Sequence, residues 1–124
     1  MLYMFLICTD PTVAPDPGAP PTLQPQHATL ERELREEGVY VSGAALMPPE
    51  FAPVARVKGG LATDGPFAET RELVGGYYLL NCSDREHAIA CAARIPVATD
   101  DWVDVRPVFL FHPDVDGITR AATA

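Results

Sequence analysis

The sequence predicts an α+β fold in which one antiparallel sheet carries two helices on the same face. Apolar segments with many aromatic and β-branched residues indicate strands at 1–8, 39–46, 54–57, 61–63, 77–82 and 102–109. Two other segments, at 24–37 and 83–95, repeat apolar residues at helical spacing. The resulting order is strand, helix, strands, helix, strand. This order is typical of a ferredoxin-like fold.

The first strand and the loop after it differ sharply in composition. Residues 1–8 form a run of apolar and aromatic residues that is too short for a buried helix. Residues 10–25 contain six prolines. Because proline removes a backbone donor and is excluded from inner strands, we expect a surface loop there.

The first helix is predicted over 24–37. His27, Leu30 and Leu34 lie three or four residues apart, so they share one face of a helix, while the charged residues 31, 32, 35 and 36 fall elsewhere. Gly38 follows as a C-terminal cap.

Turn and capping residues divide the second half of the chain. Gly59 and Gly60 predict a hairpin between the strands at 54–57 and 61–63. Ser83 followed by Glu86 resembles a capping box at the start of the second helix, which Pro96 ends.

Two strands of the predicted sheet are apolar on both faces. Successive residues of a strand point to opposite faces, and all of 2–7 and 77–80 are apolar or aromatic. Two short helices cover only one face. The other is either an aromatic-rich surface or an interface, and large apolar patches are uncommon on monomers. We therefore expect a homodimer that packs sheet on sheet.

The composition of the chain limits which classes of partner it can bind and which cellular compartment suits it. A net charge of −8 and a pI near 4.6 argue against binding to nucleic acid, which needs clustered Lys and Arg. The apolar start is too short for a membrane span or a secretory leader. Three cysteines without a paired motif favour a reducing compartment. We expect a cytoplasmic protein that does not bind membranes.

The segment 64–76 gathers turn residues and charges between two predicted strands. Gly65-Pro66 is a turn signal, and Phe67 is a large apolar side chain expected to anchor the loop to the body of the domain. Arg71 lies among acidic residues, either on a solvated face or paired with a carboxylate across a dimer. Loops of this kind often carry functional groups.

Four runs of residues carry a family resemblance: DGPFAETRE at 64–72, GGYYL at 75–79, AARIP at 92–96 and VDVRPV at 103–108. Together they resemble the YCII-related family, in its DGPF-motif branch. The resemblance covers the chain from about Gly38 to Val108 and the first strand. We expect one domain at 1–110, including the proline-rich loop at 10–25, and a polar C-terminal tail at 111–124. The resemblance also implies a ferredoxin-like fold that dimerises into an α+β barrel. Most members of the branch have no assigned activity, although a relative in the wider family is similar to a dehydrochlorinase of chlorinated hydroquinones.

Two residues are candidates for acid/base chemistry. His27 points inward with Leu30 and Leu34, and near Asp10 or Asp64 its imidazole would be a general base. The alternative is a boundary histidine at the start of a helix. Asp64 is either a catalytic carboxylate or an acceptor for the turn amides of its own loop.

Four residues are candidates for ligand binding. Asp104 and Arg106 lie two apart on the last strand and so share a face, as a buried ion pair or as the lining of a polar pocket. In a pocket, the Arg106 guanidinium would orient an anionic ligand. Arg71 and Phe67 of the central loop complete the set.

Two functions of different kinds follow from these residues. One is a small enzyme that uses proton transfer on a small organic acid or a phenol. The other is a non-catalytic dimeric module that binds a ligand or a partner protein. The histidines are scattered, and no cofactor fingerprint is present, so we expect neither a metal nor a cofactor.

Overall fold

The computed structural model describes residues 1–14, 17–18, 20, 22–48, 51, 53–65 and 73–111. Within these residues the elements are β1 (Leu2–Thr9), α1 (Gln24–Glu36), β2 (Tyr40–Ala45), β3 (Ala55–Lys58), β4 (Leu61–Asp64), β5 (Leu73–Asn81), α2 (Arg85–Arg94) and β6 (Trp102–Pro107). Neither described helix has the length and apolar character that crossing a lipid bilayer requires.

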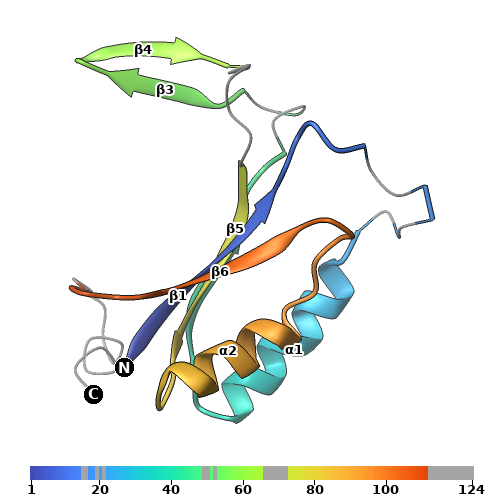
Figure 1. Cartoon of the computed structure of the whole chain (residues 1–124), viewed down its shortest axis with the longest axis vertical. Helices are drawn as coiled ribbons and strands as arrows, with labels where there is room; N and C mark the ends of the chain where they lie inside the picture. The colour runs from blue at the N-terminus through green and yellow to red at the C-terminus, as the bar shows by residue number, and fades with distance from the viewer. Residues whose placement is uncertain are drawn as a thin grey trace.

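The main sheet has four strands in the order β2-β5-β1-β6, and every neighbouring pair is antiparallel. Both helices lie against the same face of this sheet (Figure 1). The arrangement confirms the predicted α+β architecture, which is consistent with a ferredoxin-like fold.

The core lies between the helices and the sheet. From the sheet it takes Tyr3 and Phe5 of β1 and Tyr78 and Leu80 of β5; the helices contribute Leu30, Leu34, Ala88 and Cys91. All eight side chains are buried. Burial of large apolar groups of this kind is the main favourable contribution to folding.

The helix α1 begins and ends close to the predicted bounds. Pro25 occupies the first turn, where a missing N–H is tolerated, and Gly38 adopts a positive φ of 78° after the last turn. Arg94 at the end of α2 donates two hydrogen bonds of 2.8 and 2.7 Å to the Glu37 carboxylate. This ion pair lowers the pKa of Glu37 and joins the C-terminal ends of the two helices.

The cap of α2 corrects the prediction. The N-cap residue is Asp84, whose Oδ1 accepts a hydrogen bond of 2.8 Å from the His87 amide. Ser83 lies one residue earlier, and its amide donates to His87 Nδ1 at 3.0 Å. Either residue type suits an N-cap, so the one-residue difference was not resolved by sequence.

The strand β5 begins four residues earlier than expected. The two glycines predict a loop at 73–76, but residues of this segment pair with β1 and β2. The register with β1 shifts between Ile7 and Cys8, a β-bulge that leaves Gly75 without a partner in that pairing.

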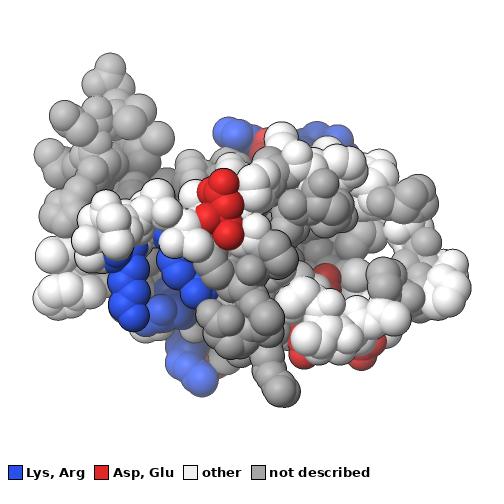
Figure 2. Space-filling view, turned by 90° about the horizontal axis from the view of Figure 1, so that it is seen from above, with Lys and Arg blue, Asp and Glu red and all other residues white. Residues whose placement is uncertain are grey.

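The predicted hairpin is present but does not join the main sheet. Its strands β3 and β4 form a separate two-stranded sheet, whose residues are all exposed. Figure 1 shows this hairpin beyond the start of β5, on the side of Leu73. The view onto this end of the molecule shows both basic and acidic side chains on its surface (Figure 2).

The helix-free face of the main sheet has a mixed surface. Met4, Leu6 and Tyr77 are half-buried there, because their neighbours in sequence point into the core. Asp104 and Arg106 share this face, as predicted, and both are exposed. The polar pair at β6 therefore lies beside an apolar centre.

Candidate functional site

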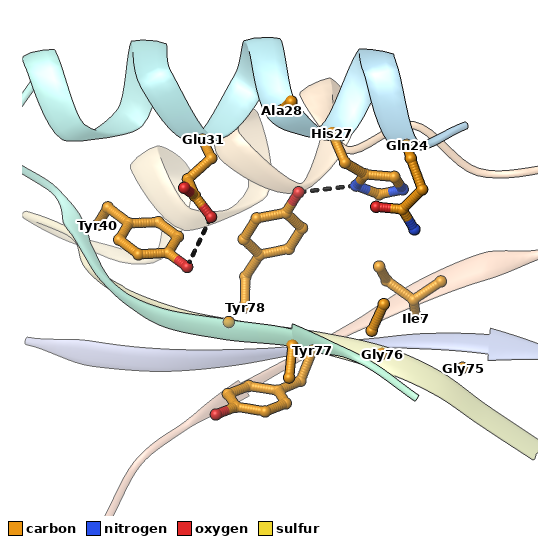
Figure 3. Close-up of a pocket in the computed structure, with 13 residues that line it drawn as sticks. Ile7, Gln24, His27, Ala28, Glu31, Tyr40, Gly75, Gly76, Tyr77 and Tyr78 are labelled. Atoms are coloured by element: carbon orange, nitrogen blue, oxygen red, sulfur yellow. Dashed lines mark hydrogen bonds between the residues drawn. The ribbon is translucent and has the colours of Figure 1, made fainter. Parts of the chain in front are cut away.

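A pocket of about 410 Å³ lies between α1 and the strands β2 and β5, on the helix-covered side of the sheet (Figure 3). Its volume falls in the range of small-molecule sites. The lining residues are Ile7, Gln24, His27, Ala28, Glu31, Tyr40, Gly43, Ala44, Ala45, Gly75, Gly76, Tyr77 and Tyr78. Figure 3 shows the side chains of His27, Glu31, Tyr40 and Tyr78 in the space between the helix and the sheet, whereas Tyr77 points away from it.

His27 and Tyr78 form the closest polar contact in this lining. His27 Nδ1 lies 2.7 Å from the Tyr78 hydroxyl, and the two rings stack with centroids 5.9 Å apart. A backbone interaction with Pro96 favours the charged form of His27. The tautomer of His27 decides which of Nδ1 and the Tyr78 hydroxyl donates in the 2.7 Å contact.

Glu31 and Tyr40 form a second polar contact in the pocket. The Tyr40 hydroxyl donates to Glu31 Oε1 at 3.0 Å. The other carboxylate oxygen accepts from Arg35 Nε at 3.3 Å, and the Arg35 guanidinium lies 4.4 Å from the centre of the Tyr40 ring. The carboxylate and the cation–π contact together fix the orientation of Tyr40.

Burial sets the protonation states of these groups. Desolvation lowers the pKa of His27, and the backbone interaction with Pro96 opposes this only in part. Desolvation, assisted by nearby Tyr40 and the Glu31 charge, raises the pKa of Tyr78 to about 12. Burial and the bond to Glu31 also raise the pKa of Tyr40. At neutral pH the imidazole is therefore uncharged and both tyrosines keep their protons.

Small residues on the strands make room for the pocket. An added Cβ at Gly43 would lie 3.0 Å from the Tyr40 hydroxyl oxygen and 3.1 Å from the Tyr77 carbonyl oxygen. Both distances are tighter than ordinary contacts, so Gly43 allows the Tyr40 hydroxyl to sit over the sheet.

Among the residues that the structure describes, none of the other predicted site residues lines this pocket. Asp64 ends β4 in the separate hairpin, opposite Ala55. Asp104 and Arg106 lie on the helix-free face, so the expected burial of an ion pair does not occur within one copy. Phe67 and Arg71 lie outside the described residues. Within the described part of one chain, His27, Asp64 and Arg106 are thus not brought together.

Three pocket residues were missed by sequence reasoning. Glu31 follows His27 by four residues, which places both on one row of the helix, but its charge predicts a position on the solvent side. Tyr77 and Tyr78 point to opposite faces of the strand, and the sequence does not show which of the two faces the helices. Tyr40 gave no signal of its own, because its partner Glu31 belongs to a different element.

Thiols and carboxylates offer little further chemistry in the described ranges. Cys8, Cys82 and Cys91 are buried and form no disulfide, and desolvation raises the pKa of Cys82 to about 12. A thiol that holds its proton so firmly is a poor nucleophile. No group of three or more His, Cys, Asp and Glu side chains in this part of the chain is arranged to hold a metal ion.

Comparison with known proteins places the chain in a family. The model of the YCII-related domain matches residues 1–112, which is most of the chain. The chain belongs to the YCII-related family. This YCII-related domain is also similar to an uncharacterized protein from Rhizobium meliloti (strain 1021), with 32% identity over 90 residues. That match covers 69% of the chain and 73% of the relative.

Proposed function

We propose that this YCII-related domain binds a small organic molecule in the pocket between α1 and β5 and transfers a proton there. The observation that carries the proposal is the 2.7 Å contact between His27 Nδ1 and the Tyr78 hydroxyl in the wall of the pocket. A proton leaving a bound ligand would pass to the Tyr78 oxygen as Tyr78 passes its own proton to His27. The Pro96 carbonyl then stabilises the imidazolium. This geometry supports His27 as the acid/base residue without Asp64.

A thermal-shift screen against phenols and small carboxylates tests the pocket. A ligand that binds the folded state raises the midpoint of unfolding. We expect at least one compound to do so, and His27→Gln and Tyr78→Phe to abolish the increase. His87→Gln is the matched control, because His87 contacts Ser83 outside the pocket. An increase that survives in both pocket variants would contradict the proposal.

A non-catalytic ligand-binding module is the second candidate. It is favoured by one observation, the separation of Asp64 and Arg106 from His27 within one chain. Incubation of the domain with each compound found in the screen, followed by mass spectrometry of the compound, separates the two candidates. A product that forms with the wild type and not with His27→Gln supports catalysis, whereas an unchanged compound supports the module.

We also propose that two copies pack through the helix-free face of the sheet into an α+β barrel, as the DGPF-motif resemblance implies. The support is the half-buried apolar centre of that face, formed by Met4, Leu6 and Tyr77. A partner copy would cover it. Three buried cysteines without a disulfide support our proposal of a reducing, cytoplasmic compartment.

Light scattering of the purified chain tests the dimer. We expect a mass of twice 13.4 kDa at micromolar concentration. Leu6→Arg places a charge at the centre of the proposed interface and should give monomers. Ile89→Arg on the surface of α2 is the control, since Ile89 is 45% exposed and lies on the opposite side of the molecule's sheet. A wild-type mass of 13.4 kDa would contradict the dimer.

A further inference from the structure

Exposed apolar side chains gather in the connection from β2 to β5. In its described part, the large apolar residues that are exposed are Leu46, Met47, Phe51, Val54, Val57 and Leu61. The hairpin of β3 and β4 lies within this connection, and Val57 and Leu61 on it are 69% and 75% exposed. A two-stranded hairpin is at best marginally stable in water without further packing. A gathering of exposed apolar groups of this kind is typical of an interaction surface.

The hairpin has one apolar face and one basic face. Two residues paired across the strands share a face, and the next pair along the hairpin lies on the opposite face. The apolar face carries Ala55, Val57 and Ala62, with Asp64 at its base. The basic face carries Arg56, Lys58, Leu61 and Thr63.

A second group of exposed apolar side chains lies at the other end of the main sheet. Phe109 and Leu110 follow β6 and are 92% and 64% exposed. Strand β6 ends beside the start of β1, whereas the hairpin precedes β5, which starts beside the end of β1. In Figure 1 the hairpin and the end of β6 both extend to the side of the sheet away from the helices. This is the face that we propose as the dimer interface.

The charges of the hairpin favour one of the two ways in which these faces can pack with two-fold symmetry. If the strands of the two copies run in opposite directions, each hairpin lies over the β6 end of the other copy, and the same contact forms twice. If they run in the same direction, hairpin meets hairpin. That arrangement brings Arg56 and Lys58 of both copies together, and like charges placed side by side weaken an interface.

We propose that the β3–β4 hairpin is a dimerisation arm whose apolar face packs on Phe109 and Leu110 of a second copy. The inference rests on the proposed sheet-on-sheet dimer, and it adds the direction of the two copies and the segments that hold them. Val57 is the main anchor of the arm, because the other apolar residues of its face are alanines. Phe109 supplies the large apolar surface opposite it.

A spin label on the hairpin tests this contact in mixed dimers. Thr63→Cys carries the label on the basic face, away from the proposed contact, and the three native cysteines are buried and react less readily. The labelled chain, in excess, is refolded together with a ¹⁵N-labelled wild-type chain, so broadening of the ¹⁵N amide signals arises between copies. We expect the signals of Phe109 and Leu110 to lose most of their intensity and those of the hairpin to keep theirs.

A label on the far side of the molecule is the control for this experiment. Ile89→Cys places the label on α2, where Ile89 is 45% exposed, on the helix-covered side of the sheet. We expect this label to leave the signals of Phe109 and Leu110 unchanged. Reduction of the nitroxide on either chain should restore every lost signal.

Two matched substitutions on the hairpin test the anchor. Val57→Asp places a carboxylate on the apolar face and should raise the dissociation constant of the dimer at least about tenfold, as loss of one buried apolar side chain does. Thr63→Asp adds the same charge on the basic face, and we expect a dissociation constant near that of the wild type. Both residues are exposed in one copy, so neither substitution disturbs its core. Sedimentation over a range of concentrations measures both, and equal effects would contradict the assignment of the two faces.

The outcomes separate this inference from the dimer on which it rests. Broadening of the ¹⁵N-labelled hairpin by the Thr63→Cys label would show that hairpin meets hairpin, which overturns the proposed contact and leaves the dimer standing. A species of twice 13.4 kDa without broadening at Phe109 and Leu110 would do the same. A wild-type chain that sediments at 13.4 kDa refutes the dimer itself, and the arm with it.

Discussion

At the residue scale, the pocket depends on an imidazole that is kept neutral. Burial lowers the pKa of His27 below its ordinary value near 6.5, so the folded chain binds this proton more weakly than the unfolded chain. Between a pH of about 6.5 and the lowered pKa of His27, the unfolded chain binds more protons than the folded chain. Stability therefore falls as the pH falls through that window, and this penalty is absent above it.

This linkage predicts the effect of replacing His27. Between about pH 7 and pH 5, the midpoint of thermal unfolding should fall more in the wild type than in His27→Gln. Arg94 also lowers the pKa of Glu37, but this contribution to the pH dependence is the same in both chains because both contain Glu37. An identical pH dependence in the two chains would show that His27 is not buried in its neutral form.

The residues of the pocket also show how far a sequence can lead. Helical spacing predicted that His27 faces inward, because it shares a helix face with Leu30 and Leu34. Both leucines are buried in the structure. Its partner could not be predicted, since Tyr78 lies 51 residues away and meets it only through packing of α1 on β5. Spacing within one element predicts a face, whereas a site needs contacts between elements.

At the element scale, the start of α2 depends on Asp84 more than on Ser83. Asp84→Ala should lower the free energy of unfolding by about 1 kcal/mol, because the His87 amide loses its acceptor. Ser83→Ala should change it by less than about 0.5 kcal/mol, as Ser83 is exposed. Denaturation by urea measures both. The reverse order would restore Ser83 as the cap.

The close approach of β2 and β5 predicts different effects for alanine substitutions at the adjacent glycines Gly75 and Gly76. An added Cβ at Gly76 would lie 2.8 Å from the Ala44 carbonyl oxygen, whereas at Gly75 the nearest atom would be 3.9 Å away. Gly76→Ala must move the backbone of β2, so we expect a loss of about 1–3 kcal/mol in the free energy of unfolding.

Gly75→Ala is the matched control for this substitution. It meets an ordinary contact, and we expect a change within about 0.5 kcal/mol. Equal effects of the two substitutions in urea denaturation would contradict the predicted spacing of the strands.

The same two glycines explain an error in the predicted elements. Glycine inside a run usually marks a turn, so the sequence predicts a loop at 73–76. In the structure these residues extend β5, where Gly75 occupies a bulge and Gly76 allows close pairing. The other strands, β1, β2, β3, β4 and β6, begin within one residue of their predicted starts.

At the scale of the whole molecule, the sheet separates two surfaces with different roles in our account. The helix-covered side holds the His27–Tyr78 pocket, and the helix-free side holds Asp104 and Arg106 beside the proposed dimer interface. The sequence predicted which residues share a face of β6. It could not show that His27 and Arg106 lie on opposite sides of the sheet, because that depends on how the helix packs.

The most direct test of the account is a map of ligand-induced amide shifts over the entire ¹⁵N-labelled chain, made with the tightest ligand from the thermal-shift screen. We predict shifts concentrated around Gln24 to Glu31 of α1, Tyr40 to Ala45 of β2 and Gly75 to Tyr78 of β5. Shifts concentrated instead around Asp104 and Arg106, or around Asp64 on the hairpin, would contradict the central claim that the helix-covered pocket is the working site.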